Sequence, residues 1–153
     1  MTFWEEICSN EVLISAIVGW VVAQALKTMI DCALNKSFSP ERLVGSGGMP
    51  SSHSATVCGL MTSAGFCYGL GSFEFAISFV LAAVVMYDAI GVRQETGKQA
   101  KLLNLIMEQD MFKMNNEQIQ ERLKEFVGHT PLQVLAGAIL GILLALLVHK
   151  NFV

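Results

Sequence analysis

Four long apolar runs separated by polar segments dominate the sequence. They cover approximately residues 12–30, 54–73, 75–92 and 131–148, each close to the roughly 20 residues that a helix needs to cross a bilayer core. One such run is compatible with a buried helix of a soluble protein, but four of them in 153 residues leave almost no chain to cover them. The pattern therefore predicts an all-α fold: a polytopic membrane helix bundle with about four transmembrane helices, in a single membrane domain over residues 1–153.

Small residues recur at four-residue spacing within these runs. Gly137, Gly141 and Ala145 form one stripe, and Gly65 with Gly69 forms another. Such stripes allow helix backbones to approach closely in lipid, so we expect the helices to pack together tightly. A unit of this kind can also form a homodimer.

The distribution of charge predicts how the bundle lies in the membrane. Only 15% of the residues are charged, against about 25% in soluble domains. Eight of the ten Lys and Arg residues lie in segments 34–52 and 93–128, whereas the turn at Gly71 and Ser72 carries none. The positive-inside rule then predicts a multi-pass protein of the cell membrane with both long loops in the cytoplasm and both chain ends outside. The net charge of −3 gives no indication of nucleic acid binding.

The cytoplasmic loop 93–128 is expected to be partly helical. Residues 99–107 are rich in helix formers, and residues 116–126 have the pattern of a short amphipathic helix after an Asn cap. The basic side chains of this loop either attract anionic headgroups or form a solvated cytoplasmic face. The sequence favours neither interpretation.

The first candidate for chemistry is the glycine-rich stretch before the second apolar run. Gly48 belongs to this stretch, and glycine permits close backbone approach to a ligand. Ser51 or Ser52 can cap the following helix, whose free N–H groups then form an anion site with His53 in the first turn. The alternative is a capped helix start at which His53 extends into the headgroups, and the spacing leaves both open.

A second histidine stands just before the fourth apolar run. Thr130 is suited to cap this helix, Pro131 to its first position, and Gln133 to completing a capping box. Capping explains Thr130 and Gln133 but leaves His129 unexplained. On the predicted topology, His53 and His129 lie at the same membrane face.

Three ionisable residues in or beside apolar runs complete the candidates. Asp88 lies inside the third run, where a carboxylate is costly and usually functional or paired, and Arg93 follows at the cytoplasmic edge. Lys27 either extends to the headgroups, pairs with Asp31 within its helix, or faces the same pocket as the two histidines. The cysteines and histidines show no spacing typical of a metal site, so we expect no bound metal.

Four segments, in chain order, resemble a known family. They are residues 47–55 (Gly-Gly-Met-Pro-Ser-Ser-His-Ser-Ala), 87–93, 97–104 and 128–131 (Gly-His-Thr-Pro), and they resemble the divergent branch of the type 2 phosphatidic acid phosphatases, related to acid phosphatases and vanadium haloperoxidases. The resemblance implies metal-independent phosphoryl transfer through a phosphohistidine, without a cofactor.

The resemblance also implies roles for individual residues. His53 matches the histidine that protonates the leaving group, and His129 is the best match for the histidine that attacks phosphorus. The groups implied to hold the phosphoryl oxygens are Lys27, Ser51, Ser52, Arg93 and the backbone at Gly48.

Two departures from the family pattern bear on activity. The whole long loop separates Arg93 from His129, and Gln133 stands where an acid normally follows the nucleophilic histidine. Asp88 is the candidate to replace that acid in space. The sequence therefore leads to a membrane phosphatase acting on a lipid phosphate or diphosphate. The alternatives are a non-catalytic protein that binds or moves a phosphorylated lipid, and a structural role such as an assembly subunit.

Overall fold

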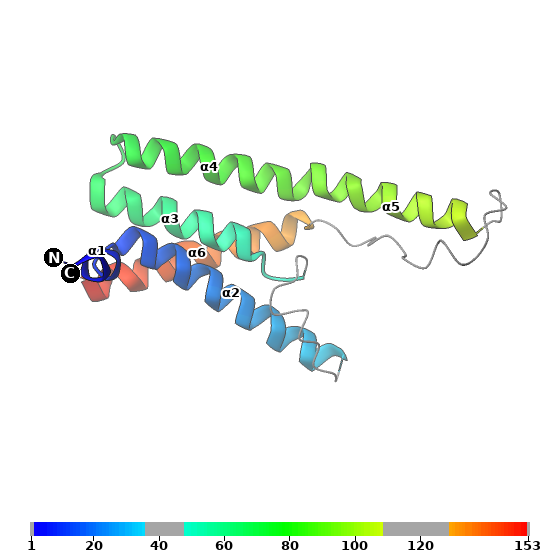
Figure 1. Cartoon of the computed structure of the whole chain (residues 1–153), viewed down its shortest axis with the longest axis horizontal. Coiled ribbons are helices and arrows are strands. Elements are labelled where there is room, and N and C mark those ends of the chain that lie inside the picture. Colours follow the sequence, from blue (N-terminus) through cyan, green and yellow to red (C-terminus); the bar gives the residue numbers. More distant parts are fainter. Residues whose placement is uncertain (1, 36–47, 109–128, 153) are drawn as a thin grey trace.

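The computed structural model describes residues 2–35, 48–108 and 129–152, and every regular element in these ranges is a helix. The elements are α1 (Phe3–Cys8), α2 (Glu11–Asn35), α3 (Ser52–Tyr68), α4 (Phe73–Ile90), α5 (Val92–Glu108) and α6 (Pro131–Phe152). The predicted all-α class is therefore confirmed. Figure 1 shows α3 at the centre of the bundle, in contact with α2, α4 and α6.

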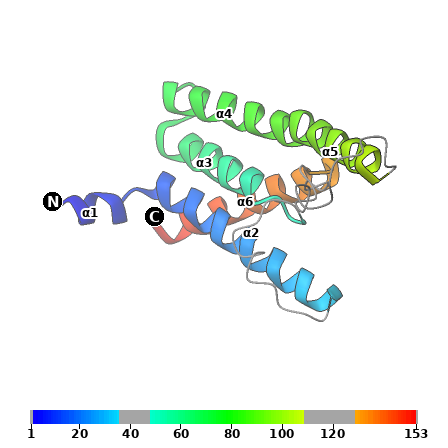
Figure 2. The ribbon, with the colours of Figure 1, turned by 45° about the vertical axis from the view of Figure 1, so that its right-hand side comes forward.

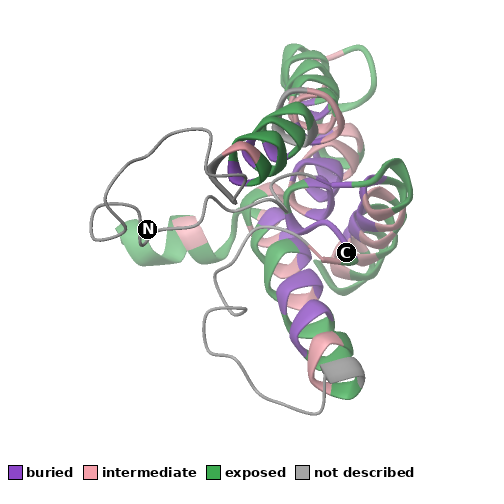
Figure 3. Ribbon diagram, turned by 90° about the vertical axis from the view of Figure 1, so that its right-hand side faces the viewer, coloured by how far each residue is buried: buried purple, intermediate pink, exposed green. Residues whose placement is uncertain are grey.

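Three stretches of the described helices are long and apolar enough to cross a membrane: α2, the continuous stretch formed by α4 and α5, and α6. Their outward faces carry exposed large apolar side chains, and burial is concentrated where the helices meet (Figure 3). Helix α3 is uncharged but only 17 residues long, at the lower end of the roughly 17 to 25 residues that suit a span. Its own membrane crossing, the fourth expected, stays a prediction.

Backbone contact between small residues holds α3 in its central place. A Cβ atom added at Gly137 would lie 2.3 Å from the Ser51 carbonyl oxygen, and one at Gly141 would lie 2.3 Å from that of Ala55. From the other side, a Cβ added at Gly19 of α2 would come within 2.8 Å of the same Ala55 oxygen. Such approach allows dense packing in lipid, where no hydrophobic force drives helices together. The stripe predicted on α6 is confirmed.

The second predicted stripe, Gly65 with Gly69, is wrong. Gly69 has φ +85° and ends α3, with open space where its Cβ would be. A Cβ at Gly65 would contact the side chains of Leu70 and Phe75, on the turn and the start of α4. This pair of glycines therefore shapes the tight turn between α3 and α4 instead of a helix–helix interface, because Gly69 takes a conformation that other residues rarely adopt.

The helix ends differ from the edges of the apolar runs because capping residues decide them. Helix α3 starts at Ser52 instead of residue 54, since the Ser51 side chain accepts the Ser54 N–H. It ends at Tyr68 instead of residue 73, and Ser72 then caps α4 by accepting the Phe75 N–H. Helices α2 and α6 continue to Asn35 and Phe152, beyond the predicted residues 30 and 148.

Helix α5 continues α4 almost in line and projects past the rest of the bundle (Figures 1 and 2). Gly91 marks the joint, and its N–H still donates to the Tyr87 carbonyl. The helix predicted over residues 99–107 is part of α5, whereas the one predicted over residues 116–126 lies outside the described residues. Both chain termini lie at one end of the bundle, and the N-terminal ends of α3 and α6 lie at the other (Figure 1). We call these the terminal end and the site end.

Candidate functional site

The start of α3 is anchored to α6 and presents its first turn at the site end. The Ser51 N–H donates to the Gln133 carbonyl at 3.1 Å, and the Ser51 hydroxyl accepts hydrogen bonds from the Ser54 N–H and the Ser54 hydroxyl. Ser51 and Ser54 are fully buried. Ser51 therefore positions the turn, and the next two residues, Ser52 and His53, occupy it. The first N–H groups of a helix lack partners within it and carry a partial positive charge, which favours an anion.

His129 is held from both its backbone and its side chain. Its N–H donates to the Ala89 carbonyl at 3.1 Å, which joins the start of α6 to the end of α4. Its Nδ1 lies 3.3 Å from Gln133 Oε1, an oxygen that also accepts the Thr130 N–H at 3.0 Å as part of the predicted capping box. An amide oxygen can only accept, so the imidazole donates from Nδ1 in this contact, and in the neutral ring the lone pair is then on Nε2.

The structure brings the two candidate histidines together. The ring centroids of His53 and His129 lie 6.3 Å apart, with the ring planes tilted by 58°. His53 is exposed, whereas His129 is only 3% exposed. One imidazole is thus accessible from outside and the other enclosed, and a single tetrahedral group between them can reach both within hydrogen-bonding or attack distance.

Lys27 lies beside the first turn of α3. Its side chain is 3% exposed, and its Nζ donates to Gln24 Oε1 at 3.0 Å and to the Ser52 hydroxyl at 3.4 Å. Gly48, at φ +87°, covers the aliphatic part of the lysine: a Cβ there would lie 3.1 Å from Lys27 Cγ. The interpretation that Lys27 extends to the headgroups is wrong, because packing directs the side chain into the bundle.

The remaining predicted site residues are placed less completely. Asp88 is half-buried in the last turn of α4, one residue before the Ala89 carbonyl that accepts the His129 N–H. The backbone of Arg93 belongs to the first turn of α5, but its side chain lies outside what the structure describes. The structure thus brings together six of the predicted residues: Lys27, Gly48, Ser51, Ser52, His53 and His129. From the segment around Asp88, it places the Ala89 carbonyl against the His129 N–H.

One residue at the site was not predicted from the sequence. Gln24 is buried and accepts the hydrogen bond from Lys27, and its own carbonyl accepts the Thr28 hydroxyl at 2.9 Å. The sequence did contain an indication of this contact, because Gln24 lies three residues before Lys27 and this spacing puts both side chains on one helix face. By contrast, no local pattern indicated the bonds from His129 to Ala89 or from Ser51 to Gln133.

The composition of this site suits a phosphate better than a metal ion. An ammonium, a hydroxyl and the N-terminus of α3 all favour an anion. Within residues 2–35, 48–108 and 129–152, no three His, Cys, Asp or Glu side chains gather as a metal site would require.

Comparison with known proteins gives two matches and one negative result. A family model described as "Divergent PAP2 family" matches residues 8–144. The chain is also similar to the "Uncharacterized membrane protein YuiD" of Bacillus subtilis (strain 168), with 35% identity over 156 residues that cover 96% of this chain and 99% of the relative. No solved structure matches.

Proposed function

The chain belongs to the divergent PAP2 family, and from this premise we propose that it is a membrane phosphatase that hydrolyses a lipid phosphate or diphosphate through a phosphohistidine on His129. The observation that carries the proposal is the pairing of His53 and His129, with ring centroids 6.3 Å apart, beside a buried lysine bound to Ser52. The proposed cycle uses only side chains and backbone groups and requires no metal ion.

Binding of the phosphoryl group rests on fixed positive groups. In phosphoryl transfer the charge of the transition state spreads over the equatorial oxygens, so preorganised donors and cations supply most of the stabilisation. Lys27, the Ser52 hydroxyl and the first-turn N–H groups of α3 are the donors that the described residues offer. Gly48 leaves its backbone close to the lysine without a side chain in between. We assign Arg93 to the same role.

Two histidines with different surroundings suit two different steps. The Nε2 lone pair of His129 attacks phosphorus while the bond to the leaving oxygen breaks, and His53 as imidazolium gives that oxygen its proton. The neutral His53 then takes a proton from the attacking water, the N–P bond breaks, and phosphate leaves. Each histidine ends in its starting state.

A lipid is the substrate class that fits the position of the site. The N-terminal ends of α3 and α6 lie together at one end of helices that can span a membrane. Tyr87, Met49 and Leu132, close in sequence to the site residues, are exposed. An exposed apolar surface next to an anion site suits a phosphate with an attached hydrocarbon tail. From the distribution of Lys and Arg, we place the site at the cytoplasmic face.

One observation favours a second candidate, a protein that binds or moves a phosphorylated lipid without hydrolysing it. The side chain hydrogen-bonded to His129 Nδ1 is the amide of Gln133. An amide orients the imidazole as a carboxylate would, but it does not stabilise a positive charge on the ring. A site with this arrangement can retain a phosphate while reacting slowly.

Phosphate release separates the two candidates. The detergent-purified protein is incubated with EDTA and a panel of lipid phosphates and diphosphates, beside His129→Ala and His53→Ala. His149→Gln, in the last turn of α6 and therefore at the terminal end, is the matched histidine control. Release by the wild type and the control, but by neither site variant, supports the phosphatase. Absence of release from all of them, or equal release by all of them, contradicts it, and retained binding of the same lipids then supports the second candidate.

A further inference from the structure

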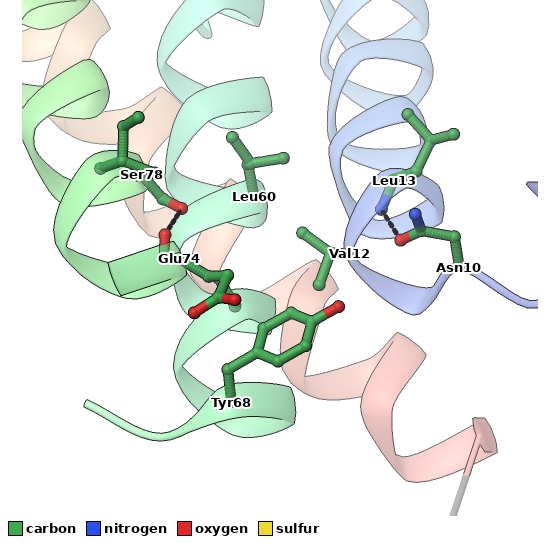
Figure 4. A pocket seen from close by; sticks show the side chains of 9 residues that line it. Asn10, Val12, Leu13, Leu60, Tyr68, Glu74 and Ser78 are labelled. Carbon is green, nitrogen blue, oxygen red and sulfur yellow. Dashed lines mark hydrogen bonds between the residues drawn. The ribbon is translucent and has the colours of Figure 1, made fainter. Parts of the chain in front are cut away.

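A groove lies at the terminal end, away from the histidine pair, between α2, α3 and α4 (Figure 4). Its volume is about 330 Å³, and it is open to the surroundings of the bundle. Its apolar lining includes Val12, Leu60 and Ile77, and its polar lining includes Asn10, Tyr68 and Glu74.

Polarity changes along this groove in the way that it changes along a phospholipid. Asn10 precedes α2, Tyr68 ends α3, and Glu74 lies in the first turn of α4, so these polar groups share one level at the helix ends. Leu60 lies about two turns further into α3, and Ile77 about one turn further into α4. A headgroup at the helix ends with a hydrocarbon chain pointing inward therefore meets matching surfaces. Tyrosine is also enriched at the depth where headgroups lie.

The charge of the groove selects among headgroups. Glu74 is the one charged side chain among the residues that line it, and no Lys or Arg is among them. Glu74 and Tyr68 both line the groove, and Figure 4 shows their side chains on the same side of it, at the ends of their helices. Tyr68 is 55% exposed, so its ring is accessible. A carboxylate beside an exposed aromatic ring favours an ammonium group and disfavours a headgroup that is only anionic.

We propose that this groove binds a bilayer phospholipid whose headgroup carries an ammonium group. The ammonium lies at Glu74 and Tyr68, and one hydrocarbon chain lies over Leu60, Val12 and Ile77. The site is separate from the phosphate site, takes a headgroup of opposite character, and does not depend on the proposed phosphatase activity.

The test compares three lipids on the full-length protein. Phosphatidylethanolamine, phosphatidylcholine and phosphatidylglycerol are added in turn to the detergent-solubilised protein, and bound lipid is counted by native mass spectrometry. We expect the wild type to retain phosphatidylethanolamine and phosphatidylcholine, which both carry an ammonium group, about fivefold better than phosphatidylglycerol, the scale of a single charged contact near a surface. Equal retention of all three lipids by the wild type overturns the proposal.

Variants locate the binding. Glu74→Gln removes the charge at an exposed position and should bring the ratio of each ammonium lipid to phosphatidylglycerol to about one. Glu6→Gln, an exposed acid of α1 outside the groove, should leave the ratio unchanged. Ile77→Trp fills the groove and should lower retention of all three lipids, whereas Val80→Trp, equally exposed on α4 but not part of the lining, should not. A preference that persists in Glu74→Gln, or equal effects of the two tryptophans, contradicts the proposal.

Discussion

Each end of the bundle holds a histidine hydrogen-bonded to another side chain, but the partners differ. At the site end, His129 Nδ1 faces the neutral amide of Gln133 at 3.3 Å. At the terminal end, His149 Nδ1 lies 2.9 Å from Glu11 Oε1, with the two side chains 32% and 11% exposed. The Ser63 hydroxyl donates to the same Glu11 oxygen at 3.0 Å, and the Phe66 ring stacks on His149 with centroids 4.7 Å apart.

The two histidines differ in the charge of their partners and in the helices that those partners join. Glu11 connects α2 to α3 through Ser63 and to α6 through His149, so this pair ties together three helices. At the site end the neutral amide of Gln133 orients the His129 ring through Nδ1. The Glu11–His149 pair therefore suits a role in stability, and the proposed chemistry stays with the histidines of the site end.

The largest expected effect is the loss of phosphate release in His129→Ala. Removal of an attacking nucleophile should lower kcat about ten-thousand-fold or more. Folding should persist, because the backbone N–H that bonds to Ala89 remains. The measurement is phosphate release with EDTA present, with thermal unfolding as the check on folding. If this variant keeps activity while His149→Gln loses it, the assignment of the two ends is reversed.

His53→Ala should cause the next largest loss, and its size should depend on the substrate. Loss of a general acid lowers kcat by about a hundred- to ten-thousand-fold when the leaving oxygen needs a proton. An aryl phosphate has a leaving group that departs without one, so the loss should shrink markedly for that substrate. Comparing kcat for a lipid phosphate and an aryl phosphate gives the result. An equal loss for both substrates would exclude His53 as the acid.

Glu11→Gln should act on stability and leave chemistry unchanged. The substitution removes the carboxylate shared by Ser63 and His149, and poorly satisfied buried polar groups cost about 1 to 3 kcal/mol. We expect a lower unfolding midpoint in detergent and an unchanged kcat for each folded molecule. Glu6→Gln, at an exposed position of α1, is the control that should change neither quantity. A fall in kcat without a change in stability would contradict a structural role for Glu11.

The smallest expected effect comes from giving His129 a carboxylate partner, like the one that His149 has in Glu11. Gln133→Glu keeps the capping box, since Glu suits that position as well as Gln. A carboxylate beside His129 favours the imidazolium, so the neutral nucleophile is lost at a higher pH as the solution is acidified. The acidic limb of the pH–rate profile should therefore move to higher pH. An unchanged profile would show that Gln133 does not contact the reacting histidine.

Much of the fold follows from residues that are neighbours in the chain. The apolar runs predict the membrane helices, Thr130 with Gln133 predicts the start of α6, and Gly137 with Gly141 predicts close helix packing. The prediction failed where two different local structures share one sequence pattern. Gly65 and Gly69 have the spacing of a packing stripe, but in the structure they shape a turn. Spacing alone does not distinguish a helical glycine from one that ends the helix.

The sequence by itself therefore determined the helical membrane class, the caps and the set of candidate residues, because these depend on periodicity and on groups a few positions apart. Only the tertiary structure decided that His53 and His129 lie 6.3 Å apart and that Lys27 reaches Ser52. It also decided that the Ala89 carbonyl accepts the His129 N–H. These contacts join residues 25 to 76 positions apart, the distances in sequence from Lys27 to Ser52 and from His53 to His129. They depend on how the helices pack against α3, which no local pattern specifies.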